Sequence, residues 1–202
     1  MKGNFFTIRA IAETGMLIAL AVIIQIVGKY TFSTFAKFVF AEGWTPYLAS
    51  IPLLYLMFRR GAVIVVIASI ITEGISFLIA NGNFIIVGSP TAFIIDYVLG
   101  RVISILIGGI VMKLLYNKLH KKNNLFIVIV VSVWFTIATL AGIWSGIVFY
   151  GEYAEWSNAW IYSMTYNISS YSIAFIILMI AIIATNKTHK ELLYPIKEKH
   201  VY

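Results

Sequence analysis

Long apolar runs recur along this chain, and they restrict its fold more than any other feature of the sequence. A run of about 20 apolar residues is long enough for a helix to cross a bilayer. We predict six transmembrane helices, at residues 9–30, 45–59, 62–80, 91–117, 125–149 and 159–185. In lipid the backbone must satisfy its own hydrogen bonds, and these runs are too long for barrel strands. The sequence therefore predicts an all-α integral membrane protein.

The composition agrees with this class and excludes others. Of the 202 residues, 61% are hydrophobic and only 11% are charged. No polar stretch is long enough to form a soluble domain, so we expect a single transmembrane domain over residues 1–202. The chain has no cysteine, which excludes disulfides and cysteine-based metal sites.

The distribution of basic residues predicts the orientation. Twelve of the 15 lysines and arginines fall on one side of the predicted spans; they are Lys2, Arg9, Arg59, Arg60, Lys113, Lys118, Lys121, Lys122, Lys187, Lys190, Lys197 and Lys199. The positive-inside rule then places both termini in the cytoplasm. The net charge of +7 is explained by cytoplasmic loops, so we expect no nucleic-acid partner. The expected location is a cell membrane, as a multi-pass protein of a bacterial plasma membrane.

Three ionisable residues lie inside predicted spans: Glu73, Asp96 and Arg101. Such residues are costly in lipid and usually face the interior of a bundle. At 1.5 Å per residue, Glu73 and Arg101 reach similar depths on antiparallel helices. We therefore expect them to form an ion pair. The rival interpretation is that Glu73 faces a binding pocket.

Aromatic and polar residues converge at the predicted outer face. Asp96 and Tyr150 reach that face from two spans, and Trp44 precedes a third. The last span begins there with two neighbouring stripes; they are Ser163, Asn167 and Ser170, and Tyr162 and Tyr166. An interfacial aromatic belt explains single aromatics, but it explains neither Asp96 nor the polar stripe. A carboxylate, an amide and aromatic faces instead indicate a pocket for a small cationic or aromatic ligand.

Motifs for catalysis are not found. The sequence has no H-E-x-x-H, no P-loop and no paired acidic motif at metal-binding spacing. We therefore expect neither an enzyme, nor a metal site, nor an ATPase site of its own.

One long segment carries a resemblance to a known family. "SGIVFYGEYAEWSNAWIYSMTYNISSY" (145–171) resembles a signature segment of the thiamine-binding S-components of energy-coupling factor (ECF) transporters. Four further segments match in order: "ETGMLIALAVIIQIV" (13–27), "IPLLYLMFRRG" (51–61), "PTAFIIDY" (90–97) and the basic break before the fifth predicted helix. The resemblance covers nearly the whole chain.

The resemblance implies six transmembrane helices and a thiamine site near the outer face. It implies docking on a transmembrane coupling protein that works with two ABC-type ATPases, with thiamine as transported ligand and no cofactor. The ligand-binding residues that it implies are Trp44, Asp96, Tyr97, Gly146, Tyr150, Tyr162 and Asn167. Glu73 is a further candidate only on the rival interpretation that it faces the pocket. Gly15 and Ala19 form a small-xxx-small pair that would dock on the coupling protein, or would pack within the bundle.

Two departures from the family pattern leave the identity of the ligand open. The family often has histidine where this chain has Gly142, and tryptophan where it has Tyr150. The same fold could therefore bind a thiamine precursor or another cationic heterocycle. The alternative from a different class is a membrane enzyme or scaffold whose aromatics form only a belt.

Overall fold

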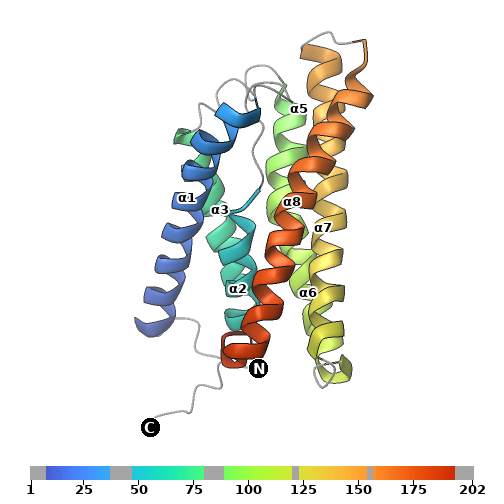
Figure 1. Cartoon of the computed structure of the whole chain (residues 1–202). Helices are drawn as coiled ribbons and strands as arrows, with labels where there is room; N and C mark the ends of the chain where they lie inside the picture. The colour runs from blue at the N-terminus through green and yellow to red at the C-terminus, as the bar shows by residue number, and fades with distance from the viewer. Residues whose placement is uncertain (1–7, 37–46, 80–88, 120–122, 154–156, 194–202) are drawn as a thin grey trace.

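A computed structural model describes residues 8–36, 47–79, 89–119, 123–153 and 157–193 of the chain. Within these ranges every regular element is helical. The long helices run alternately up and down and form a bundle (Figure 1). The start of α1 and the end of α8 lie at the same end of the bundle, at the bottom of Figure 1.

The elements follow the chain in this order: α1 (Ile8–Ala36), α2 (Ser50–Arg60), α3 (Ala62–Ile79), α5 (Pro90–Phe93), η1 (Ile94–Ile103), α6 (Ser104–Leu119), α7 (Asn123–Val148), η2 (Phe149–Tyr153), α8 (Ala159–Thr188) and η3 (Lys190–Leu193). The segments α5, η1 and α6 are consecutive parts of one continuous helix, in which η1 is π-helical. This helix contacts α3 on one side and α7 on the other.

Two predicted boundaries differ most from the structure. The first helix continues to Ala36 and not only to residue 30. Residues 31–36 contain neither glycine nor proline, which would end a helix. The second helix begins at Ser50, not at residue 45; residues 47–49 form no helix. This helix is therefore short, with only 11 residues.

Among the described residues, four helical stretches are long and apolar enough to cross a membrane. They are Ile8–Phe32, Pro90–Leu115, Leu125–Glu152 and Ala159–Thr188. Helix α3 is apolar but shorter within the described residues. The structure thus supports an all-helical membrane protein, while six crossings and cytoplasmic termini stay predictions.

Helix α2 lies in the lower half of the bundle and forms the centre of the apolar core (Figure 1). Its Leu53, Leu54 and Met57 are fully buried, and they pack in one cluster with Ile105 of α6 and Trp134 of α7. The helix ends at Gly61, whose N–H donates to Met57 O. Gly61 has φ 86° and ψ 179°, a conformation that is essentially restricted to glycine, and it lets the chain turn directly into α3. The apolar core therefore fills the end of the bundle at which α2 and α3 join.

Candidate functional site

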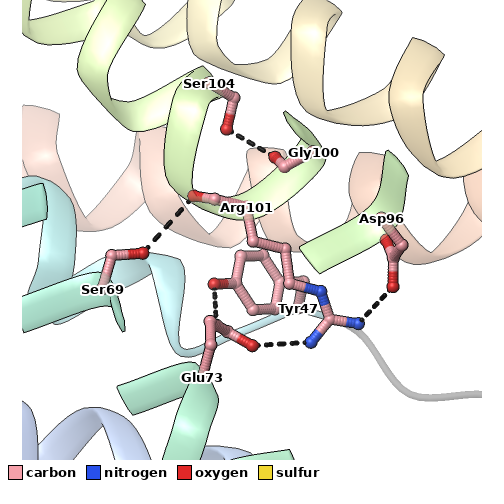
Figure 2. A network of polar contacts seen from close by, with 7 residues as sticks. All are labelled: Tyr47, Ser69, Glu73, Asp96, Gly100, Arg101 and Ser104. Carbon is pink, nitrogen blue, oxygen red and sulfur yellow. Dashed lines mark hydrogen bonds and ion pairs between the residues drawn. The ribbon is translucent and has the colours of Figure 1, made fainter. Parts of the chain in front are cut away.

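A cluster of charged side chains is buried where α3 and η1 meet. Arg101 on η1 forms two ion pairs, at 2.8 Å to Glu73 Oε2 and 3.0 Å to Asp96 Oδ2 (Figure 2). The side chain of Glu73 is 5% exposed, whereas those of Asp96 and Arg101 are 16% and 17% exposed. The predicted ion pair between Glu73 and Arg101 is confirmed. Its second carboxylate partner, Asp96, was not anticipated from the sequence.

Two tyrosines complete the surroundings of the guanidinium. Arg101 Cζ lies 4.3 Å from the ring centroid of Tyr97 and 5.0 Å from that of Tyr47. The Tyr47 hydroxyl also donates a hydrogen bond to Glu73 Oε1. Arg101 thus lies between two carboxylates and two aromatic rings, which is the environment that favours a planar cation.

The π-helical pitch of η1 explains how Asp96 and Arg101 meet. In an α-helix, residues five apart lie about 140° apart around the axis, so their side chains diverge. A π-helix instead bonds each N–H to the carbonyl five residues earlier, which brings such residues onto one face. The Ser104 N–H bonds Leu99 O in this way at the end of η1. Short π-helical stretches are frequent at functional sites.

Side chains of neighbouring residues hold η1 in place. The Ser104 hydroxyl donates to Gly100 O at 2.5 Å, and the Ser69 hydroxyl of α3 donates to Arg101 O at 3.4 Å (Figure 2). Gly100 faces α7, where an added β-carbon would lie 3.2 Å from Ala141 Cβ. These contacts fix the backbone that carries Asp96 and Arg101.

The polar stripe of α8 lies against α7. Ser163, Asn167 and Ser170 are all buried. The Ser163 hydroxyl donates to Ile143 O at 2.6 Å, and Asn167 Nδ2 donates to Ser163 O at 2.9 Å. Gly146 provides the space for this contact, because a side chain there would overlap Ser163. The hydrogen bond of Ser163 therefore joins the two helices, whereas that of Asn167 lies within α8.

Gly142 lies one turn from Gly146 and makes a similar close approach. A β-carbon at this position would come within 2.7 Å of Asn167 Oδ1 and 2.9 Å of Tyr171 Cε2. Asn167 and Tyr171 thus pack directly against the backbone of α7 here. A histidine at position 142 would require both of these side chains to move.

Tyrosines form a chain of contacts from η2 along α8 toward the charged cluster. The rings of Tyr150 and Tyr162 meet edge to face at 4.6 Å, and Tyr162 stacks on Tyr166 at 6.4 Å. Tyr166 and Tyr171 both interact electrostatically with Asp96 and Arg101. The polar end of the α7–α8 pair therefore lies close to the charged cluster on η1.

The structure brings the predicted site residues into two adjoining groups. Glu73, Asp96 and Tyr97 belong to the charged cluster. Gly146, Tyr150, Tyr162 and Asn167 belong to the α7–α8 group; Trp44 lies outside the described residues.

Sequence reasoning missed Tyr47 and Tyr171. Tyr47 precedes a short helix, and no periodic pattern assigned it a face. Tyr171 falls one residue after Ser170 and could have been found as the continuation of the polar surface of α8.

The charges and functional groups of the site suit the binding of a small ligand. Its charged cluster contains two carboxylates and one guanidinium, so its formal net charge is −1. Among the described residues, no group of three or more histidine, cysteine or acidic side chains could hold a metal ion. The arrangement offers a carboxylate, amide groups and aromatic faces to a cationic ring.

The proposed docking pair lies on the outer surface of α1. Gly15 and Ala19 are both exposed, and a β-carbon on Gly15 would meet nothing within 4 Å. Large apolar neighbours, Met16 and Leu20, are exposed beside them. Neither small residue is needed for packing between the described helices.

Comparison with known proteins gives one family and one fold. The family model described as Thiamine transporter protein (Thia_YuaJ) matches residues 11–194. Among solved structures, ThiT from Listeria monocytogenes superposes with a TM-score of 0.63 at 18% sequence identity, covering 91% of this chain and 96% of that chain. No curated protein sequence matches the chain.

Proposed function

The chain belongs to the thiamine transporter protein family, and from this premise we propose that it is a high-affinity thiamine-binding subunit of an ECF-type vitamin uptake transporter. One observation carries the proposal beyond family membership. Inside an apolar bundle, a cluster of net charge −1 adjoins a row of tyrosines. Thiamine has an amino group on a pyrimidine and a permanent positive charge on its thiazolium ring, so its groups complement this site.

Asp96 is the proposed partner of the aminopyrimidine, with Tyr97 beside it. An ionised carboxylate only accepts hydrogen bonds, which suits an exocyclic amine. Tyr150 and Tyr162 offer ring faces to the thiazolium, and Asn167 can both donate and accept. Gly146 is proposed as a ligand residue on the grounds of the sequence resemblance alone, because Ser163 lies in the space beside it. Trp44 remains a candidate on the grounds of the sequence resemblance, and Glu73 on the rival interpretation that it faces the pocket.

The wider assembly is also a proposal. We propose six membrane crossings, both termini in the cytoplasm, and a location in a bacterial plasma membrane. Energy would come from two ABC-type ATPases through a transmembrane coupling protein. The exposed pair Gly15 and Ala19 supports α1 as the docking helix, since small residues let helices approach closely in lipid.

A second ligand is supported by a specific observation. Asn167 and Tyr171 fill the space beside Gly142. The sequence resemblance implies a histidine at this position in many members of the family. A pocket altered in this way could accept a thiamine precursor or another cationic heterocycle. Thiamine and the alternative ligands would bind to the same fold, and the two proposals differ only in which ring the pocket prefers.

A ligand titration tests the proposal. The purified protein in detergent is titrated with thiamine, with its neutral aminopyrimidine half and with other cationic heterocycles, while tryptophan fluorescence is recorded. Saturable quenching by thiamine at the lowest concentration is expected. Quenching only by a precursor or analogue supports the second ligand. If none of these compounds quenches the fluorescence, a binding role is contradicted.

A further inference from the structure

Arg101 uses only one oxygen of Asp96. Its terminal nitrogens contact Glu73 Oε2 and Asp96 Oδ2 (Figure 2). Within the residues that the structure describes, Asp96 Oδ1 accepts no hydrogen bond. The Asp96 side chain also keeps 16% of its surface exposed. One carboxylate oxygen is therefore held by the protein, and the other is available to a ligand.

Arg101 is itself held on several sides. Glu73 receives hydrogen bonds from both Arg101 and the Tyr47 hydroxyl, so the carboxylate that positions the guanidinium is fixed in turn. The ring of Tyr97 lies 4.3 Å from Arg101 Cζ. A planar guanidinium with this many contacts keeps its orientation better than a flexible ammonium would.

The second oxygen of Asp96 can interact with a ligand in only one way. A carboxylate in a poorly solvated site is costly unless a cation pairs with it, and Arg101 is that cation. A carboxylate oxygen only accepts hydrogen bonds. An acceptor-only oxygen distinguishes a ring that carries an amine from a ring that carries an oxo group.

We propose that Arg101 is a positioning and specificity-determining residue of the ligand site. By holding Asp96 Oδ2, it fixes the orientation of the Asp96 carboxylate and presents Oδ1 as an acceptor for the exocyclic amine of the ligand. The site thereby selects aminopyrimidine rings over their oxo counterparts. This inference rests on the proposed thiamine-binding function.

The test compares two ligands that differ at a single group. Dissociation constants are measured by calorimetry for thiamine and for the analogue with an oxo group in place of the amine. The proteins are the unaltered chain, Arg101→Met, Arg101→Lys and the double variant Glu73→Gln/Arg101→Met. Tyr55→Phe is the control for a merely structural loss, because it removes a hydrogen bond to Ala181 O far along the chain from this cluster.

The preference of the unaltered chain for thiamine should fall about tenfold in Arg101→Met, the scale of one charge-assisted hydrogen bond. Arg101→Lys keeps the positive charge and should retain part of the preference. Arg101→Met alone leaves Glu73 without its cation and could fail to fold. The double variant removes both members of the Glu73–Arg101 pair and avoids this problem. Its preference for thiamine over the oxo analogue should also be reduced, whereas Tyr55→Phe should keep the full preference.

Two results overturn different claims. If the unaltered chain does not bind thiamine, the proposed function itself fails, and this inference fails with it. If the unaltered chain binds thiamine and the folded Arg101→Met or double variant keeps the full preference, only the role of Arg101 is refuted.

Discussion

Gly142 of α7 and Asn167 of α8 approach so closely that a β-carbon on Gly142 would lie 2.7 Å from Asn167 Oδ1. Asn167 cannot move away freely, because its Nδ2 donates to Ser163 O at 2.9 Å. The tight packing of these two helices therefore depends on position 142 being glycine, which has no side chain. It also fixes the orientation of an amide that we propose contacts the ligand.

Gly142→Ala should consequently destabilise the protein by about 1–3 kcal/mol, as overpacking of a filled interior does. Thermal unfolding in detergent measures this loss. Gly108→Ala is the matched control, since its β-carbon would meet Trp134 Cβ at an ordinary 3.6 Å. Equal unfolding temperatures for the two variants would show that the α7–α8 contact is looser than described.

The Glu73–Arg101 ion pair should appear as coupling in a double-mutant cycle. Glu73→Gln and Arg101→Met should each lower stability, because removing one partner of a buried pair can cost about 3–5 kcal/mol. The double variant should recover part of the summed loss. Strictly additive losses in thermal unfolding would argue against the pair. Such losses together with abolished thiamine binding in Glu73→Gln would instead make Glu73 a ligand residue.

This pair was predictable from the sequence, whereas the contact with Asp96 was not. Counting the rise per residue from the predicted helix ends placed Glu73 and Arg101 at one depth. Ideal α-helical geometry would put Asp96 and Arg101, five residues apart, on different faces. Only the π-helical pitch of η1 brings them together, and no pattern in the sequence indicated that pitch. The composition and apolar runs likewise indicated a helical membrane protein, but not the buried, central position of the short α2.

The backbone of Gly61 leads to a separate prediction about the turn between α2 and α3. Its φ of 86° with ψ of 179° lies in a region that is nearly exclusive to glycine. Gly61→Ala should cost about 1–3 kcal/mol from backbone strain alone, because nothing lies within 4 Å of its β-carbon position. Gly74→Ala, within α3 and equally free of contacts, should be neutral or slightly stabilising. Identical unfolding temperatures for both variants would contradict the turn.

The exposed surface of α1 predicts a separation of binding from transport. Replacing Gly15 and Ala19 with tryptophan should block close approach of a partner helix. Thiamine binding by the purified protein should persist, because neither residue belongs to the charged cluster or the tyrosine row. Uptake of labelled thiamine into cells that also express the coupling protein and ATPases should be lost. Uptake that survives the double change would place docking on another face.

Asp96 provides the most direct test of the central claim that this cluster binds thiamine. Calorimetric titration with thiamine compares the unaltered chain with Asp96→Asn, which keeps the shape and removes the charge. Glu152→Gln, which neutralises an exposed carboxylate on η2, is the control for a general change in charge. We expect saturable binding by the unaltered chain and by the control. For Asp96→Asn we expect a loss of about 1.5–3 kcal/mol in binding free energy. Absence of thiamine binding by the unaltered chain, or equal affinity in a folded Asp96→Asn variant, would contradict a thiamine site at this cluster.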